Sequence, residues 1–175
     1  ARFTEAEILK PANWDLLNML MDSRTGLGRF REFRVSNYQL MMELIDYCRD
    51  HTVDQIIALP DVKERIDLYF EHEEKFKDQI MRCSTVHDNL VVLDLREEEM
   101  IYAGNRFMIY ALFPDCNISI HVLWGLNKLN TVFATGKSIL NKTSKTNENA
   151  GTCQIENEDS VRVLGELIKK ITADG

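Results

Sequence analysis

The sequence predicts a mixed α/β fold of the α+β type. An N-terminal helical arm ends in a long connecting helix, and a mixed β-sheet domain flanked by helices follows. Residues 61–82 contain no glycine or proline, and their apolar side chains recur at helical spacing. In residues 118–124, by contrast, the side chains of one face (Ile118, Ile120, Val122 and Trp124) alternate with those of the other, a period of two that is typical of a strand. Residues 160–171 return to helical spacing. These patterns divide the chain into a helical region, 1–84, and an α/β domain, 85–175.

Capping residues and prolines divide the first region into five predicted helices. Thr4 and Glu7 have the spacing of a capping box, in which each side chain bonds the backbone N–H of the other residue. Asn13 and Ser36 are residue types that often cap a helix N-terminus. Pro60 disfavours helix at the residue before it. The predicted helices are 5–10, 13–21, 36–49, 52–59 and 61–82, the last about 33 Å long at ~1.5 Å per residue.

Apolar side chains at helical spacing are predicted to form the buried faces of these helices. The opposite face of the 61–82 helix is rich in glutamate and lysine, and we expect it to face solvent. The predicted buried residues are Trp14, Leu17, Leu20, Met21, Leu40, Met41, Leu44, Ile45, Cys48, Val62, Ile66, Tyr69, Phe70, Phe76 and Ile80.

The second region reads as strands followed by one helix. A hairpin is predicted where the alternating segment meets a turn at residues 125–128. Residues 96–100 are predicted as an acidic turn or a short helix, and Asp159 or Ser160 caps the last helix. The predicted strands are 90–95, 105–113, 118–124, 131–134 and 151–156.

Composition narrows the range of ligands. The net charge of −7 and the pI near 5.1 argue against non-specific binding to DNA or to a membrane surface. Residues 105–147 are an exception, because five basic side chains oppose one aspartate there, a local charge of +4. The basic residues are Arg106, Lys128, Lys137, Lys142 and Lys145. A basic region in an acidic protein fits a small anionic ligand better than a long polyanion.

Cysteine and histidine spacing predicts no metal site. Cys48, Cys83, Cys116 and Cys153 contain no C-x-x-C pair, so buried free thiols are the favoured reading. The four histidines lack metal-binding spacing, and the glutamate runs at 71–74 and 97–99 are predicted to be solvated faces. No apolar run reaches the ~18 residues of a membrane span. The given residues contain no signal-peptide pattern and begin at Ala1 without methionine, so we expect a fragment of a longer cytoplasmic protein.

A polar stretch from Thr135 to Thr152 is the main candidate site. It consists mostly of Gly, Ser, Thr, Asn and Lys, whose backbone N–H groups, hydroxyls and ammonium groups are the donors that a phosphate needs. A solvated surface loop has the same composition. The candidate residues are Lys137, Ser138, Asn141, Lys142, Thr143, Ser144, Lys145, Thr146 and Asn147.

A second candidate is the segment Ser23–Arg29. Gly26 and Gly28 permit close backbone approach, and Arg24 is able to reach a phosphate. The segment is neither a Walker loop nor a G-x-G-x-x-G motif, and an interdomain loop with solvated arginines explains it equally well.

Residues 117–154, NISIHVLWGLNKLNTVFATGKSILNKTSKTNENAGTCQ, resemble the C-terminal substrate-binding domain of DHH-family phosphoesterases, above all the bacterial exopolyphosphatase-related proteins. Residues 14–48 resemble the segment that joins the two domains there. The resemblance implies a set of substrate-binding residues: Lys137, Ser138, Asn141, Ser144, Lys145, Thr146, Asn149, Gly151 and Arg24. In that family a glycine-rich stretch with a histidine precedes the Asn-Ala-Gly run. Here Asn147 is followed directly by Glu148, and we expect a chain break at this junction that hides such a loop.

The resemblance also implies the chemistry of the parent protein. DHH enzymes hold two metal ions, usually manganese, with aspartates and histidines of an N-terminal domain. That aspartate cluster and the Asp-His-His triplet do not occur in this sequence, so Mn²⁺ or Mg²⁺ is expected in a domain outside it. The implied substrates are polyphosphate, short oligonucleotides or cyclic dinucleotides. Long DNA and membranes are not expected as partners because of the acidic net charge, and a second copy of the chain is an expected partner. A stand-alone nucleotide-binding or dimerisation module is the alternative.

Overall fold

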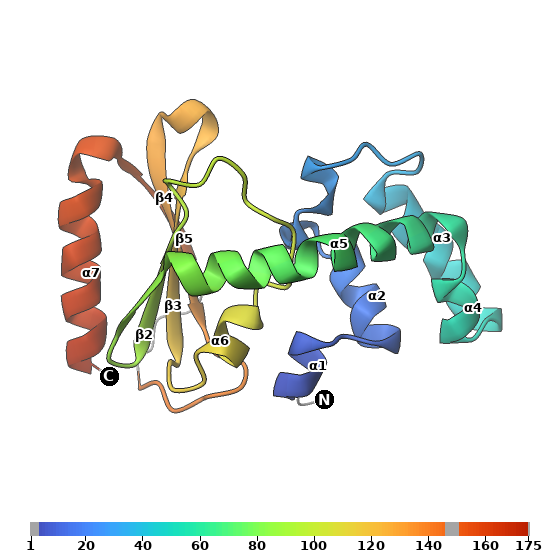
Figure 1. The fold of residues 1–175 in the computed structure, drawn as a ribbon, viewed down its shortest axis with the longest axis horizontal. Helices are drawn as coiled ribbons and strands as arrows, with labels where there is room; N and C mark the ends of the chain where they lie inside the picture. Colours follow the sequence, from blue (N-terminus) through green and yellow to red (C-terminus); the bar gives the residue numbers. More distant parts are fainter. Residues whose placement is uncertain (1–3, 146–150, 175) are drawn as a thin grey trace. The chain divides into compact units, whose positions relative to one another are not determined.

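The computed structural model describes residues 4–145 and 151–174 (Figure 1). It contains N-terminal helices, a long helix, a five-stranded mixed sheet and a C-terminal helix, as the sequence predicts. The chain divides into two compact units. The helical unit consists of residues 4–78 and 102–108. The sheet unit consists of residues 79–101, 109–145 and 151–174. Among these described residues, no helix is long and apolar enough to cross a membrane.

The helical unit is built from helices that begin where caps are available. The Thr4 capping box is present, and Ser36 Oγ accepts the N–H of Gln39. The predicted Asn13 cap is wrong, because Asn13 is already the first helical residue and Ala12 precedes it without a side-chain bond. The elements are α1 (Glu5–Leu9), α2 (Asn13–Met21), the 3₁₀ turns η1 (Ser23–Thr25) and η2 (Leu27–Arg29), α3 (Asn37–Asp50), α4 (Val53–Ile57) and α5 (Pro60–Cys83).

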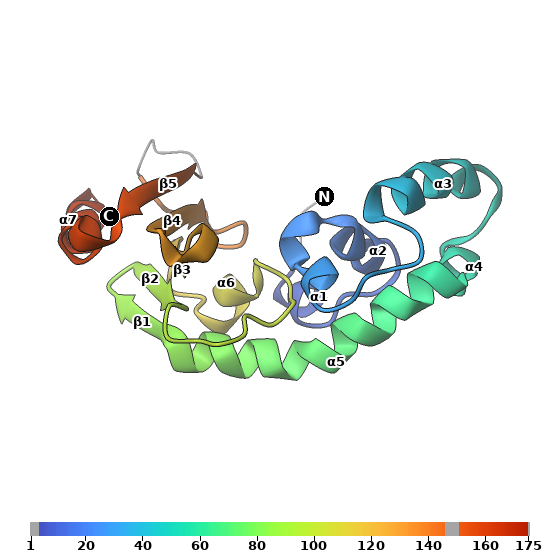
Figure 2. The same cartoon turned by 90° about the horizontal axis from the view of Figure 1, so that it is seen from above.

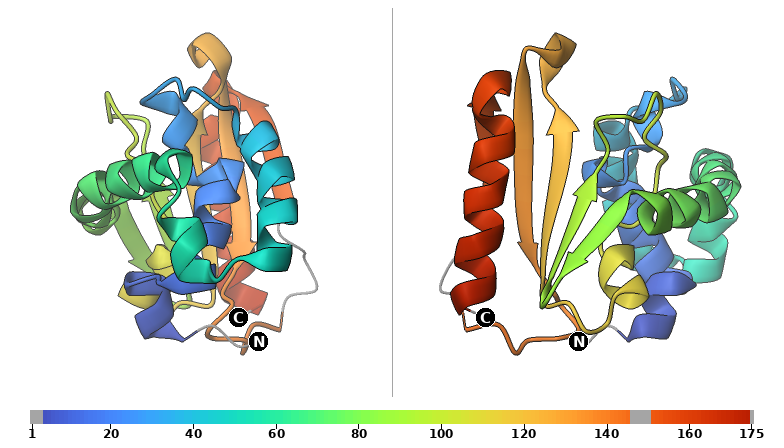
Figure 3. Two further views of the ribbon diagram at one scale, coloured as in Figure 1. Left: turned by 90° about the vertical axis from the view of Figure 1, so that its right-hand side faces the viewer. Right: turned by 60° about the vertical axis from the view of Figure 1, so that its left-hand side comes forward.

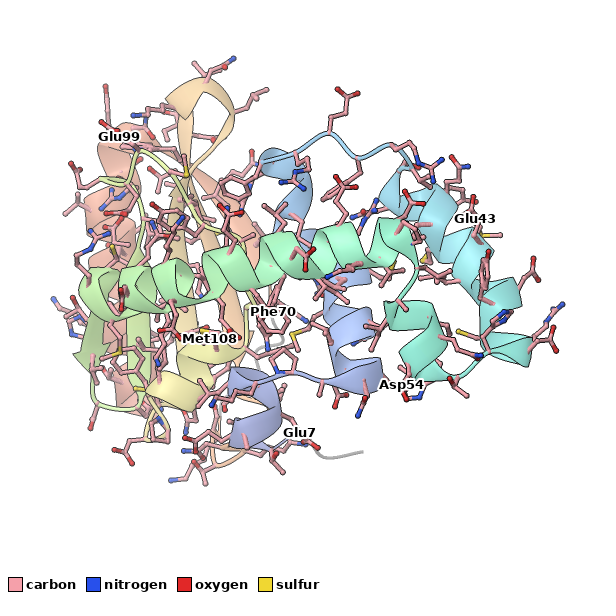
Figure 4. The ribbon with its side chains drawn as sticks, turned by 45° about the vertical axis from the view of Figure 1, so that its right-hand side comes forward. Glu7, Glu43, Asp54, Phe70, Glu99 and Met108 are labelled. Atoms are coloured by element: carbon pink, nitrogen blue, oxygen red, sulfur yellow. The ribbon has the colours of Figure 1, made fainter. Side chains whose placement is uncertain are left out.

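The core of the helical unit uses narrower helix faces than the sequence predicts. In α3 only Leu40 and Leu44, one turn apart, are buried, so the helix contacts its neighbours through a single stripe. In α2 the buried face is Leu16, Leu17 and Leu20. Predicted core residues outside these stripes are exposed: Trp14 (50%), Met41 (42%), Ile45 (51%), Cys48 and, on α5, Phe70 (44%; Figure 4).

The sheet has the strand order β1-β2-β3-β4-β5, in which only β2 and β3 pair in parallel. The predicted strand at 105–113 is wrong, because this segment contains helix α6 (Met108–Leu112). A parallel pair needs a long crossover connection, and α6 lies within it. The strands are β1 (Ser84–His87), β2 (Leu90–Asp94), β3 (Ile118–Trp124), β4 (Asn130–Lys137) and β5 (Gly151–Glu156).

Strand β1 was not predicted. It forms a hairpin with β2 through Asp88 and Asn89, and Asp88 has a positive φ of 57°. Asparagine and aspartate tolerate this conformation better than most residues.

The cysteines are less buried than the sequence predicts. The prediction of a buried thiol is wrong for Cys48 and Cys153, which are exposed, whereas Cys116 is buried.

Helix α7 (Ser160–Asp174) lies along one side of the sheet (Figures 2 and 3). The 3₁₀ turn η3 (Leu126–Lys128) joins β3 to β4, and η4 (Asn157–Asp159) leads from β5 into α7. Alternate residues of the strands form the apolar face that α7 covers. The buried members of this core are Leu90, Val92, Ile118, Ile120, Val122, Phe133 and Ile171.

Candidate functional site

The candidate site begins at the end of β4, which is longer than the predicted strand. It continues through Gly136 and Lys137, which pair with Ser119 and Ile118 of β3. The start of the polar stretch therefore has a fixed backbone. Lys137 is partly exposed at the end of this strand.

Ser138 shapes the turn that follows β4. Its backbone N–H donates to the carbonyl of Asn117 at 2.8 Å. Its hydroxyl oxygen accepts the N–H groups of Leu140 at 3.2 Å and Asn141 at 2.9 Å. Because Ser138 is only 6% exposed, its side chain supports the turn from inside.

A chain of polar side chains attaches the rest of the segment, the 138–145 loop, to the sheet unit. Asn141 donates to the carbonyl of Pro114 at 3.2 Å and accepts the hydroxyl of Thr143 at 2.7 Å. That hydroxyl in turn accepts the Nδ2–H of Asn117 at 3.0 Å, and Asn117 Oδ1 accepts Nδ2–H of Asn89 at 2.9 Å. The loop thus has a defined conformation although most of its residues reach the surface.

The remaining predicted site residues differ in their solvent exposure and in the hydrogen bonds that they already make. Lys145 is exposed and Ser144 is partly exposed. Gly151, the first residue of β5, exchanges hydrogen bonds with the hydroxyl of Thr135 at 3.1 and 3.2 Å. Thr146 and Asn149 lie outside the described residues, as does the junction of Asn147 and Glu148 where we expected a chain break.

The side chains packed against the end of β4 explain why residue 136 is glycine. Tyr110 Oη and Ser119 Oγ form a buried hydrogen bond of 2.7 Å. A Cβ atom on Gly136 would lie 3.0 Å from that hydroxyl of Tyr110 and 3.3 Å from that of Ser119. A larger residue would therefore press on this bond directly beside Lys137.

Arg24, the candidate of the helical unit, is held by a neighbouring carboxylate. Its Nε and Nη2 donate to Asp22 at 2.8 and 2.6 Å, and its backbone N–H donates to the same side chain. Hydrogen bonding by Arg24 is the main reason that the pKa of Asp22 is lowered. With its side chain 60% exposed, Arg24 keeps its other N–H groups available.

No metal site is formed within residues 4–145 and 151–174, since no group of three His, Cys, Asp or Glu side chains there is able to hold an ion. His72 instead has a structural role in the helical unit. Its Nδ1 accepts the N–H of Ala103 at 3.2 Å, and its ring packs edge-on against Phe30 and Tyr102. Burial lowers the pKa of His72 and favours the neutral ring that this bond requires.

One interaction was not predicted, because residues 97–99 form a run of glutamates that we expected to face solvent. Glu98 accepts two hydrogen bonds from Arg82, at 2.6 and 2.8 Å, and one from Gln79 at 2.6 Å. Arg82, and then Gln79, lower the pKa of Glu98 to about 2. The residues are 16 and 19 positions apart, so no local spacing could have revealed the contact.

A known structure matches the whole chain. It is the pGpG-specific phosphodiesterase PggH from Vibrio cholerae, which is 58% identical, with a TM-score of 0.92 over 100% of this chain. The chain spans 64% of the length of that protein. No protein-family model matches the sequence, and a comparison with curated proteins gives no match. With this identity over its full length, the chain belongs to the family of that phosphodiesterase, the DHH phosphoesterases that its sequence resembles.

Proposed function

We propose that the chain is the substrate-binding part of a DHH-type phosphodiesterase that hydrolyses the linear dinucleotide pGpG. The observation that carries this proposal is the 58% identity, over 100% of this chain, to a phosphodiesterase specific for pGpG. Among the substrates that the sequence suggested, a short oligonucleotide is thereby favoured over polyphosphate and cyclic dinucleotides.

The end of β4 and the 138–145 loop are the proposed phosphate site. pGpG carries a terminal phosphate and an internal phosphodiester, so the protein groups that bind it must donate hydrogen bonds to phosphate oxygens. Lys137 and Lys145 supply charge, and Ser144 supplies a hydroxyl. Ser138 and Asn141 act by holding the loop, because their side chains are already bonded within it. Thr146, Asn149 and Gly151 complete the proposed set.

Arg24 stays in the proposal as a phosphate ligand of the helical unit. Asp22 occupies one edge of its guanidinium and fixes its orientation. A guanidinium has five N–H donors, so the N–H groups that Asp22 does not use remain for a phosphate.

The metal ions of the reaction, manganese or magnesium, are proposed to bind to residues that this chain does not supply. The described residues contain no suitable ligand group, and no chemical step is assigned to them here. A cytoplasmic location and a homodimer remain predictions.

The test is substrate specificity of the intact parent protein. With Mn²⁺ present, we expect it to cleave pGpG to mononucleotides much faster than it cleaves a cyclic dinucleotide or polyphosphate. Cleavage of polyphosphate in preference to pGpG would contradict the proposed substrate. Tight pGpG binding without any hydrolysis would instead favour a nucleotide-binding module.

A further inference from the structure

The segment between α2 and α3 holds four arginines, and three of them are paired with carboxylates. The pairs are Arg24 with Asp22 at 2.6 Å, Arg31 with Glu64 at 3.3 Å, and Arg34 with Asp61. Arg29, the fourth, has no ion pair and no side-chain hydrogen bond to any residue that the structure describes. Its charge is therefore the one in this segment that the helical unit does not neutralise by direct contact.

The guanidinium of Arg29 lies directly over Gly26. Gly26 has a φ of +84°, a conformation that favours glycine. A Cβ atom there would lie 2.2 Å from Nη2 of Arg29 and 2.6 Å from its Cζ. The backbone conformation thus favours glycine at position 26, and a larger residue there would displace the guanidinium of Arg29 from its place over this residue.

The backbone beneath Arg29 is fixed to the rest of the helical unit. Thr25 is buried, and its hydroxyl donates to the carbonyl of Met19 at 2.7 Å. The carbonyl of Thr25 accepts the N–H of Gly104 at 3.0 Å. An anion that binds Arg29 therefore does not have to order this part of the backbone.

Arg29 is also partly removed from water at its charged end. The side chain as a whole is exposed, but Gly26 lies against the guanidinium and the ring of Phe30 is 5.9 Å away. Desolvation by burial lowers the pKa of Arg29, although an arginine keeps its charge. A partly desolvated cation without a counter-charge is stabilised by an anionic ligand.

We propose that Arg29 is an anion-binding residue that holds a phosphate group of the nucleotide substrate. A guanidinium matches a phosphate because two parallel N–H donors meet two oxygens. The identity of the ligand rests on the proposed function, whereas the anion site itself rests on the arrangement of Arg29 over Gly26. The site differs from the Arg24 candidate, whose Nε and Nη2 are bonded to Asp22.

Affinity for pGpG in the intact protein provides the first test. Arg29→Gln should weaken binding about 10- to 100-fold, the range expected for a charge-assisted hydrogen bond. Arg31→Gln removes the same charge two residues away, at an arginine already paired with Glu64, and should change affinity less than about threefold. Arg29→Lys keeps the charge but not the bidentate hydrogen bonding, so its affinity for pGpG should lie between those of Arg29→Gln and Arg31→Gln. Equal affinities for the Arg29→Gln and Arg31→Gln proteins, at equal thermal stability, would overturn the inference.

A second measurement does not depend on pGpG. Phenylglyoxal modifies accessible arginines, and mass spectrometry of the wild-type protein reports each site. Inorganic phosphate should slow modification of Arg29 at least about threefold more than that of Arg31, because Arg29, unlike Arg31, is expected to hold the anion. Equal protection would overturn the anion site. Protection of Arg29 in a protein that neither binds nor cleaves pGpG would support the site and reject the proposed function.

Discussion

Asn117 and Thr143 are joined by a hydrogen bond of 3.0 Å from the side-chain Nδ2 of Asn117 to the hydroxyl of Thr143. Asn117 is buried immediately before β3, whereas Thr143 lies in the exposed part of the 138–145 loop. The bond therefore connects the central strands to the proposed phosphate-binding loop.

Thr143→Val should lower the free energy of unfolding by about 0.5–1.5 kcal/mol, since it removes this hydroxyl while nearly keeping the side-chain volume. Thr143→Ser is the matched control, because it keeps the hydroxyl. Urea unfolding of a double-mutant cycle with Asn117→Ala measures the coupling between the two positions. If the valine and serine variants are equally stable and the cycle shows no coupling, the bond does not hold the loop.

Glu98 should make stability depend on pH in acid. Its folded pKa of about 2 is lower than its ordinary value of 4.5. Its contribution is therefore fully present above about pH 4.5 and is lost as the pH falls towards 2. Glu98→Gln should cost about 1 kcal/mol near neutral pH, because solvent around the 62% exposed side chain of Arg82 screens the pair.

The free energy of unfolding of wild type and Glu98→Gln, measured from about pH 6 to about pH 2.5, checks this expectation. The difference between them should shrink as the pH falls. Glu99→Gln is the control, since Glu99 is exposed in the same run of glutamates (Figure 4). A difference that stays constant over this range would show that ionisation of Glu98 does not stabilise the fold.

Gly104 should tolerate no side chain. A Cβ atom there would lie 2.0 Å from Cδ1 of Phe76, a buried ring on α5, and close packing in protein interiors hinders such a ring from moving aside. Gly104→Ala is therefore expected to destabilise the helical unit by about 2–3 kcal/mol, as overpacked cores do. Gly28→Ala, where no atom lies within 4 Å of the new methyl group, should change stability by less than about 0.5 kcal/mol. Similar melting temperatures for the two variants would contradict this packing.

The 175-residue chain is expected not to hydrolyse phosphoesters by itself, even with added manganese. Its described residues bring no three carboxylate, imidazole or thiol groups together in a way that holds an ion. Release of mononucleotide from pGpG by the purified chain is the measurement. Manganese-dependent release that a chelator abolishes would show that the chain supplies a catalytic centre.

Local sequence signals were sufficient for elements whose boundaries and faces depend on nearby residues. Thr4 and Ser36 cap α1 and α3, as the sequence predicts. The alternation from Ile118 to Trp124 correctly predicts β3. The apolar run at 105–113 failed, because a short apolar segment suits a strand or a buried helix equally well. Its helix α6 follows from the crossover that the parallel β2–β3 pair requires.

Composition located a candidate loop, but it did not reveal which side chains hold it in place. Ser138 reads as a phosphate ligand in the sequence, yet it is buried with its hydroxyl bonded inside the turn. The bonds that fix the loop join Asn117 to positions 28 residues before and 26 residues after it. Such contacts depend on how the strands pair in the folded sheet, and local sequence patterns do not reveal this pairing.

Lys137 tests the proposed substrate site most directly, because it stands at the end of β4 in fixed register with Ile118. Equilibrium titration of pGpG against the intact protein at fixed salt should show a 10- to 150-fold loss of affinity in Lys137→Ala, from a bond of roughly 1.5–3 kcal/mol. Stability should change by less than about 0.5 kcal/mol. Lys169→Ala, the same charge change on an exposed residue of α7, should leave affinity within about twofold of wild type. Equal affinities of Lys137→Ala and wild type would contradict the assignment of this site.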